Sequence, residues 1–193
     1  NNIKIINNMK KIKSKKIIAV FCGSKSGNNP IYKQETKKIT KILSNKYSVI
    51  YGGGKIGLMG IIYETIEKSM GTITGIIPKF LNLPNIRQRN TNNLIIVDSL
   101  HRRKLLMIKK SDIFLILPGG FGTLDELFEI LTLNQLNIVN KPVIIFNIAN
   151  YWKNLKHLLE TMEKEGFLYK KDLKNISWIN DSEDLNKKIE KLN

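Results

Sequence analysis

Short apolar runs alternate with longer amphipathic stretches along most of the chain, and this alternation limits the fold more than any other feature of the sequence. The runs are followed by glycine, proline or other turn-forming residues. Short runs that are apolar throughout are typical of parallel strands, because helices cover both faces of a parallel sheet. We expect strands at 17–22, 48–51, 72–77, 94–97, 113–117, 143–146 and 176–179.

The segments between these runs have the periodicity of helices. They predict helices over 30–43, 57–70, 99–110, 123–136, 150–165 and 181–192, the third of them capped by Asp98 or Ser99. Strands that alternate with helices predict an α/β fold: a single Rossmann-like domain over 16–193, with a doubly wound parallel sheet and helices on both faces. Residues 1–15 contain no acidic residue and predict a disordered tail, with an acid-poor targeting extension as the alternative.

The composition argues against several classes of protein. The chain has 193 residues and one cysteine, so it cannot have the disulfide framework of a small secreted domain. It has no secretory signal pattern and no apolar run near the roughly 18 residues of a membrane span, so we expect a cytoplasmic protein. The net charge is +16, but the lysines are scattered, and Asn and Ile are enriched with them. We therefore interpret most of the charge as solvated surface, with a basic groove for nucleic acid as the alternative.

Arginine is distributed differently from lysine. The chain has four arginines, Arg87, Arg89, Arg102 and Arg103, and all fall within 17 residues. A guanidinium binds phosphate or carboxylate through two parallel hydrogen bonds, which an ammonium cannot do. The cluster therefore indicates an anion site or, as the simpler alternative, surface salt bridges.

Four junctions that follow predicted strands have unusual sequences. In a parallel sheet the carboxyl ends of the strands share one edge, where ligands bind. The four junctions are 21–27, 51–60, 97–104 and 117–126. Gly52, Gly54 and Gly57 match the dinucleotide fingerprint G-x-G-x-x-G, but the next strand ends at 74–78 without the acidic residue that would hold a ribose. A nicotinamide or flavin cofactor is therefore not expected; close approach to a mononucleotide and tight strand–helix packing both stay open.

The loop 117–126 combines glycines with a carboxylate. Its three glycines precede a predicted helix, so backbone N–H groups and the helix dipole favour an anion there. No lysine follows them, so the loop predicts a phosphate monoester site and not a Walker loop. Thr123 and Glu126 also fit a capping box, T-x-x-E, in which the carboxylate only closes the helix. Catalysis and capping are both open for Glu126.

Three other reactive side chains have simpler interpretations. His101 has no second His or Cys at metal-ligand spacing, so a zinc site is not expected. His157 is expected on the surface of a helix. Cys22 ends the first strand and is expected to be a small buried side chain without a nucleophilic role.

Two motifs resemble a known family. Residues 118–126 read PGGFGTLDE, which fits PGGxGTxxE, and residues 101–107 read HRRKLLM, which fits H-x-R-K-x-x-M. The segments CGSKSG at 22–27 and GGGKIGLMG at 52–60 fit the two earlier glycine loops of the same family. Over roughly 16–168 the chain resembles the LONELY GUY (LOG) family of cytokinin riboside 5′-monophosphate phosphoribohydrolases, many of which were formerly labelled possible lysine decarboxylases.

The resemblance implies a homodimer that hydrolyses the N-glycosidic bond of adenosine 5′-monophosphates, with or without an N6 substituent, to an adenine-type base and ribose 5-phosphate. It implies a small nucleoside monophosphate as partner, no metal or organic cofactor, no specific nucleic acid and no membrane. Leu133, Leu136 and Ile138 form an apolar stretch that suits a dimer interface. An AMP nucleosidase without a cytokinin role and a non-catalytic nucleotide-binding module are alternatives. A pyridoxal-phosphate lysine decarboxylase is another, although no lysine stands out for it.

The resemblance also implies roles for individual residues. Arg103 and Glu126 correspond to the catalytic pair. The residues that correspond to substrate-binding positions are Ser24, Gly53, Gly54, Lys104, Gly119, Gly120, Gly122, Thr123 and Thr132. Of these, Gly119, Gly120, Gly122 and Thr123 would hold the phosphate.

Overall fold

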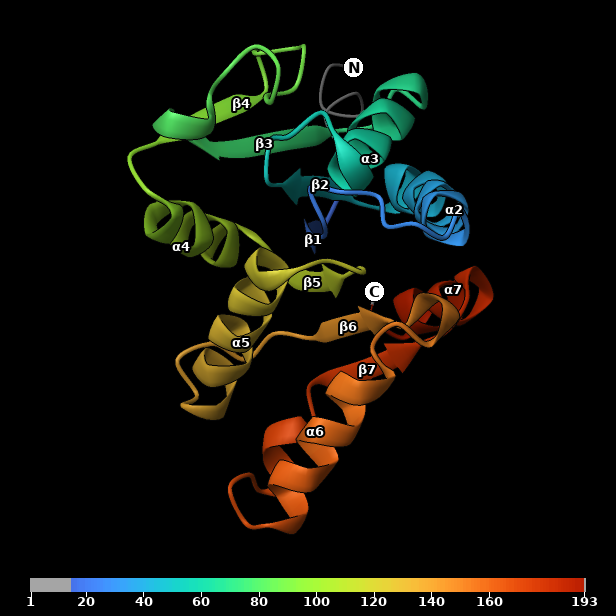
Figure 1. Ribbon diagram of the computed structural model, residues 1–193, viewed down its shortest axis with the longest axis vertical. Coiled ribbons are helices and arrows are strands. Elements are labelled where there is room, and N and C mark those ends of the chain that lie inside the picture. Colours follow the sequence, from blue (N-terminus) through green and yellow to red (C-terminus); the bar gives the residue numbers. More distant parts are fainter. Residues whose placement is uncertain (1–14, 193) are drawn as a thin grey trace, which may run out of the picture.

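A computed structural model describes residues 15–192, in which seven strands form one parallel sheet (Figure 1). The strands are β1 (Ile17–Phe21), β2 (Ser48–Tyr51), β3 (Ile73–Pro78), β4 (Leu94–Val97), β5 (Ile113–Ile116), β6 (Val143–Phe146) and β7 (Ile176–Ile179). Their order is β4-β3-β2-β1-β5-β6-β7, and each neighbouring pair is parallel. The predicted doubly wound α/β fold is confirmed.

Helices cover both faces of the sheet. They are α2 (Ile31–Lys46), α3 (Gly57–Lys68), α4 (Leu100–Lys110), α5 (Phe121–Gln135), α6 (Lys153–Lys164) and α7 (Ser182–Leu192), with short 3-10 turns η1 (Lys79–Leu81), η2 (Ile148–Asn150) and η3 (Lys170–Leu173). In Figure 1, α2, α3 and α7 lie on one side of the sheet, and α4 and α5 lie on the other. None of the helices between residues 15 and 192 is long and apolar enough to cross a membrane.

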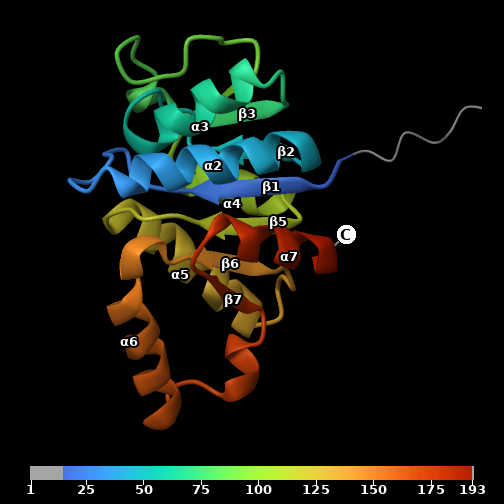
Figure 2. The same ribbon diagram turned by 90° about the vertical axis from the view of Figure 1, so that its right-hand side faces the viewer.

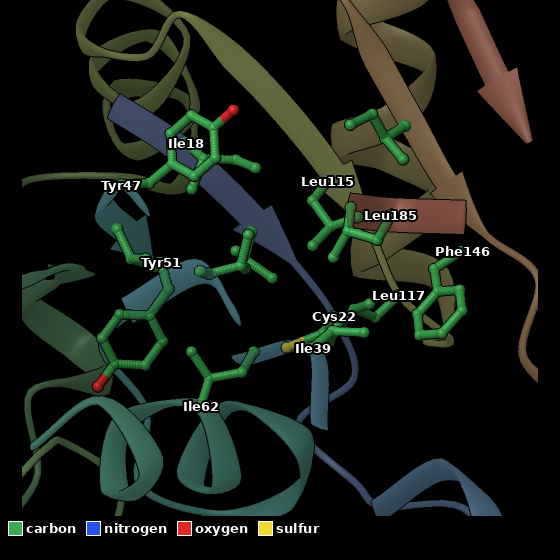
Figure 3. Close-up of a cluster of buried hydrophobic side chains, with 14 of the residues drawn as sticks. Ile18, Cys22, Ile39, Tyr47, Tyr51, Ile62, Leu115, Leu117, Phe146 and Leu185 are labelled. Atoms are coloured by element: carbon green, nitrogen blue, oxygen red, sulfur yellow. The ribbon is translucent and has the colours of Figure 1, made fainter. Parts of the chain in front are cut away.

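The two faces of the sheet are packed into separate cores. Successive residues of a strand point to opposite faces, so Ile18 of β1 packs with α2, α3 and α7, while Ala19 packs with α4 and α5. Figure 3 shows part of the first core, where Ile39 and Ile62 meet side chains of the central strands. Because β1 is buried on both faces and lies between β2 and β5, the loop that follows it starts from the rigid centre of the sheet.

Several predicted boundaries agree with the structure and others do not. The predicted bounds of β2, β4, β6 and β7 are those of the structure. Helix α4 is capped by Ser99, whose hydroxyl accepts a hydrogen bond from the Arg102 amide at 3.1 Å. Helix α3 ends at Lys68, two residues earlier than predicted, because Met70 takes a left-handed conformation with φ 52°.

Two other helices begin at unexpected places. Helix α5 begins at Phe121 and not at Thr123, because Gly120 ends the loop as the N-cap residue. Helix α6 begins at Lys153, three residues later than predicted, because η2 precedes it, in which Ala149 and Asn150 are left-handed. The predicted disordered tail, 1–15, lies outside the described residues except for Lys15, whose ammonium group donates to the Ser44 carbonyl at 3.3 Å.

Candidate active site

A cavity of about 530 Å³ lies at the carboxyl edge of the sheet, where the strand order reverses between β1 and β5. In Figure 2 this edge is on the left, where the arrow of β1 ends. Loops after β1, β2, β5 and β6 contribute to the lining, together with residues from α2, α3, α4 and α5. Two of the four predicted junctions, 21–27 and 117–126, therefore contribute most of the cavity wall.

The loop after β5 opens directly into this cavity. Gly119, Gly120, Gly122 and Thr123 all line it, as the sequence predicted. A side chain added at Gly120 or Gly122 would meet nothing within 4 Å, so the backbone there is open to a ligand. Gly120 is the N-cap residue of α5, and the first amides of a helix have no partner within it. The loop therefore offers backbone N–H groups and the positive end of a helix dipole to an anion.

Arg103 and Glu126 form an ion pair in the cavity wall. Arg103 lies in the first turn of α4 and Glu126 in the second turn of α5. The Arg103 Nη2 donates to the Glu126 Oε1 at 2.5 Å, and the two side chains are only 13% and 8% exposed. The Nε of Arg103 is also buried and has no hydrogen-bond partner among the described residues. This N–H donor of the guanidinium is thus unpaired within the described part of the chain.

Burial has a strong effect on Glu126. It raises the pKa of the carboxyl group to about 7, although the neighbouring Arg103 guanidinium acts in the opposite direction. A carboxyl group with such a pKa exchanges its proton near neutral pH, which suits a general acid or base. The pair therefore combines a fixed cation with a group that titrates near pH 7.

The capping box that the sequence left open at Thr123 and Glu126 is absent from the structure. A capping box requires its threonine at the N-cap, but that position is held by Gly120, and Thr123 lies inside α5. The Thr123 amide donates to the Gly120 carbonyl at 3.1 Å. The carboxylate of Glu126 pairs with Arg103 instead. The sequence left capping and catalysis open for Glu126, and the structure excludes capping.

The glycines after β2 are packed against protein, and only the first of them also lines the cavity. A Cβ at Gly52 would lie 3.0 Å from the Met59 sulfur and 3.7 Å from Arg103 Nη1. Gly53 and Gly54 do not line the cavity. Gly53 has φ 76° and lies against Ile77 and Leu94, and Gly54 lies against Met59. The tight-packing interpretation of the G-x-G-x-x-G pattern therefore holds for most of this loop.

Lys104 and Thr132 also lie outside the cavity of the single chain. The Lys104 ammonium pairs with Asp125 at 2.9 Å and Glu129 at 2.6 Å. Burial alone would lower the pKa of Lys104, but the bonds to these two carboxylates outweigh it and raise the pKa. The Thr132 hydroxyl donates to the Phe128 carbonyl at 2.8 Å. Their roles in substrate binding stay predictions, since neither residue is brought to the cavity.

The remaining predicted residues occupy different environments. Ser24 is exposed on the cavity wall. Cys22 is buried with Ile39 and Leu117, as Figure 3 shows, and burial raises the pKa of its thiol, so the prediction of a buried cysteine is confirmed. His157 is exposed on α6, as predicted. His101 is exposed as well, and residues 15–192 contain no cluster of three His, Cys, Asp or Glu side chains that could hold a metal.

The arginine cluster does not converge on the cavity as a group. Arg103 is the only one of the four that lines it. The backbone of Arg87 forms a β-bridge with Gly54, and the side chains of Arg89 and Arg102 are exposed. Of the four arginines that indicated an anion site, only Arg103 is therefore placed to contact a ligand in the cavity.

Two tyrosines of the cavity were not predicted from the sequence: Tyr32 comes from α2, and Tyr151 comes from the loop after β6. A third aromatic residue of the lining, Phe121, lies within the predicted junction 117–126. The Tyr151 hydroxyl donates to the Gly119 carbonyl at 2.6 Å. Tyr151 follows a strand and could have been found by the same strand-end rule that selected the glycine loops. Nothing in the local sequence marks Tyr32.

Comparisons with known proteins agree with the sequence motifs. Residues 59–189 match the protein family described as "Possible lysine decarboxylase". The chain is 40% identical over 154 residues to the cytokinin riboside 5′-monophosphate phosphoribohydrolase LOG1 of Arabidopsis thaliana, an alignment that covers 79% of this chain and 72% of that protein. It is 37% identical over 150 residues to the probable cytokinin riboside 5′-monophosphate phosphoribohydrolase LOGL3 of Oryza sativa subsp. japonica, with 77% and 71% covered.

Solved structures share the fold at lower identity. The molybdenum cofactor binding protein from Rippkaea orientalis superposes with a TM-score of 0.68 and 18% identity, covering 93% of this chain and 98% of that chain. The protein TM1055 superposes with a TM-score of 0.68 and 20% identity, covering 91% and 99%. At such identities the similarity shows a common fold and carries no statement about ligands.

Proposed function

The chain belongs to the LONELY GUY (LOG) family, and from this premise we propose that it is a phosphoribohydrolase that hydrolyses the N-glycosidic bond of cytokinin riboside 5′-monophosphates. The products are a free adenine-type base and ribose 5-phosphate. Curated relatives with this activity in their names align with more than three quarters of the chain. The observation that carries the proposal is the buried pair of Arg103 and Glu126, which shares one cavity with the glycine loop after β5.

The glycine loop binds the 5′-phosphate of the substrate. Gly119, Gly120, Gly122 and Thr123 surround the N-terminus of α5, where free amides and the helix dipole favour a dianion. Holding the phosphate fixes the ribose relative to the catalytic pair. Binding energy from a part of the substrate that does not react is thereby used to orient the carbon that does.

Glu126 acts at the anomeric carbon. As the C1′–N9 bond lengthens, its electron pair goes to the base and positive charge develops on C1′ and the ring oxygen. The ionised Glu126 stabilises this charge and accepts a proton from the water whose oxygen bonds to C1′. The departing base takes up a proton, so that one water molecule is consumed for each base released. The pKa of about 7 keeps Glu126 able to accept and return a proton near neutral pH.

Arg103 orients both Glu126 and the substrate. Its Nη2 holds the carboxylate, and its buried Nε has a free donor. A planar guanidinium can keep both directions fixed at once, whereas an ammonium is a point charge without a plane. Gly52 lies beside the guanidinium, since a Cβ at that position would be in van der Waals contact with Nη1 at 3.7 Å.

The residues of the cavity do not fit the decarboxylase label of the family description. A decarboxylase of the pyridoxal phosphate type needs a lysine for a Schiff base and an acidic partner for the ring nitrogen. Lys25 is the only lysine among the described residues that line the cavity, and it is exposed on the loop after β1. The single carboxylate of the lining, Glu126, is paired with Arg103.

The proposal is tested by incubating the protein with AMP and with N6-isopentenyl-AMP and separating the products by chromatography. Release of base from the N6-substituted nucleotide supports the cytokinin role, and release from AMP alone indicates an AMP nucleosidase. A protein that binds both nucleotides and releases no base is a non-catalytic binding module. A cytoplasmic location belongs to the same proposal, because nucleoside monophosphates are charged and do not cross a bilayer unaided.

We also propose that two copies of the chain form a homodimer next to the active site. Exposed apolar side chains on α4 and just after α5 support it: Leu100, Leu105, Leu136 and Ile138. Leu133, which the sequence also assigned to this face, packs against the core instead. Such a surface is costly for a monomer to expose to water. Light scattering at working concentration tests the proposal, and the mass of a single chain would contradict it.

A further inference from the structure

Two tyrosines join the loops that surround the cavity. The ring of Tyr32, from α2, lies over Gly27, so closely that a side chain at Gly27 would collide with it. The ring of Tyr151 meets Tyr32 edge to face, with centroids 5.7 Å apart and planes at 81°. The Tyr151 hydroxyl then donates to the Gly119 carbonyl at 2.6 Å. This chain of contacts connects the loop after β1, the loop after β6 and the glycine loop after β5.

The hydrogen bond to Gly119 sets the direction of one particular amide. A peptide unit is planar and trans, so the carbonyl of Gly119 and the N–H of Gly120 point in opposite directions within one plane. Gly119, on one side of this unit, is packed against Thr123 and the Gly23 backbone, whereas Gly120, on the other side, has open space around it and few restraints of its own. By holding the carbonyl, Tyr151 therefore holds the N–H of Gly120, at the N-cap of α5.

The loop that carries Tyr151 is strained and firmly held. Ala149 and Asn150 are consecutive left-handed residues, with φ 49° and 61°, although neither is a glycine. Such conformations are unfavourable, above all for alanine, and persist only where the surrounding contacts enforce them. The Asn147 side chain enforces them: its Oδ1 accepts from the Trp152 amide at 2.7 Å, and its Nδ2 donates to the Asn150 side chain at 3.4 Å. The ring of Trp152 also packs edge to face against Tyr151.

We propose that Tyr151 is a positioning residue for the phosphate, acting through the Gly119–Gly120 peptide. The inference rests on the proposed function only in assigning the phosphate of the substrate to the glycine loop. Tyr151 is 42% exposed on the cavity wall, so its hydroxyl has water as an alternative partner. The effect of losing the bond is accordingly modest, and it is specific to ligands with a phosphate.

The test compares Tyr151→Phe with Tyr169→Phe, a matched loss of one hydroxyl at an exposed tyrosine that does not line the cavity. Binding of ribose 5-phosphate is measured by calorimetry, and the thermal midpoint is measured without ligand. We expect Tyr151→Phe to bind ribose 5-phosphate about threefold to tenfold more weakly at an unchanged midpoint. With nucleotide substrates, KM should rise more than kcat falls. Tyr169→Phe should match the parent in both measurements.

The alternative outcomes are separable. Unchanged affinity of Tyr151→Phe for ribose 5-phosphate would overturn the inference, and so would a lowered midpoint with unchanged affinity, which indicates a merely structural role. A parent that does not bind ribose 5-phosphate would overturn it as well. A parent that binds ribose 5-phosphate but releases no base fails the proposed phosphoribohydrolase activity, while the comparison of Tyr151→Phe with the parent still decides the inference.

Discussion

The loops after β2 and after β5 are both rich in glycine, but the structure uses their glycines in opposite ways. After β2, Gly57 has φ 63° and lies against the backbone of Ser24, and Gly53 has φ 76° and lies against two apolar side chains. After β5, Gly120 and Gly122 have open space where a side chain would be. The first loop is packed against protein, whereas the second is packed at Gly119 and leaves its backbone at Gly120 and Gly122 for a ligand.

The comparison teaches that a glycine motif does not by itself indicate where a ligand binds. The fingerprint G-x-G-x-x-G at 52–57 would suggest a nucleotide, yet its last glycine serves the contact with the loop after β1. That contact helps to place Ser24 on the cavity wall. The β2 loop thus supports the site, and the β5 loop together with the ion pair of Glu126 provides its chemistry.

The largest effect on stability is expected at Gly57. Gly57→Ala places a Cβ in a left-handed conformation and against the Ser24 backbone, which cannot move away as a flexible side chain could. We expect the free energy of unfolding to fall by about 2–4 kcal/mol, measured by denaturant titration. The matched change Gly122→Ala lies in open space within α5 and should leave stability unchanged or raise it by up to about 1 kcal/mol. Equal losses in both variants would contradict the contrast between the loops.

The largest effect on catalysis is expected at Glu126. Glu126→Gln keeps the shape of the side chain and its ability to accept from Arg103, but removes the charge and the proton acceptor. We expect the rate of base release to fall by about 100-fold or more, with a small change in thermal midpoint. The control is Glu129→Gln, one turn further along α5, where the carboxylate pairs with Lys104. Base release at the parental rate in Glu126→Gln would remove this residue from the mechanism.

A smaller loss of catalytic rate is expected when the Arg103 guanidinium is replaced by an ammonium group of the same charge. Arg103→Lys keeps the positive charge but loses the plane and the second donor direction, so we expect the rate of base release to fall by about tenfold to thirtyfold. The neighbouring Arg102 is exposed and does not line the cavity, so Arg102→Lys serves as the control. The measurement is the steady-state rate of base release by both variants. Similar rates for the two would show that charge alone is sufficient at position 103.

The sequence predicted the structural features that depend on residues close by in the chain. It missed those that depend on residues distant in the chain and close in space. A largely apolar run such as 48–51 ends at three glycines, and its strand appears with the predicted bounds. The start of α5 was misplaced because Thr123 and Glu126 match a local capping pattern, whereas Gly120 and the distant Arg103 decide the outcome. The contact of Tyr32 with Tyr151 joins residues more than a hundred positions apart, and no local pattern encodes it.

The smallest of these effects is expected in the pH dependence of kcat/KM. This dependence reports on Glu126, next to the loop after β5, and not on the packed loop after β2. Burial raises the pKa of Glu126 to about 7 from an ordinary value of 4.5. If the ionised form is required, about a tenth of the molecules carry it at pH 6, so kcat/KM should fall about tenfold from its plateau, with an apparent pKa near 7. A profile that is flat from pH 6 to 8 would contradict this role.

Stability should change in the opposite direction over the same range. Between the unfolded pKa near 4.5 and the folded pKa near 7, the folded protein binds more protons at Glu126, so the stability that this residue contributes is present below pH 4.5 and is lost as the pH rises through 7. The thermal midpoint of the parent relative to Glu126→Gln should therefore fall from pH 5 to pH 8, because subtracting the variant removes the contribution of the other carboxylates. In Gly57→Ala the same trend should remain, since Glu126 and Arg103 are intact there. Parallel midpoint curves for the parent and Glu126→Gln would show that Glu126 titrates no differently in the folded and unfolded states. In that case its burial beside Arg103 would not tune it for proton transfer near neutral pH.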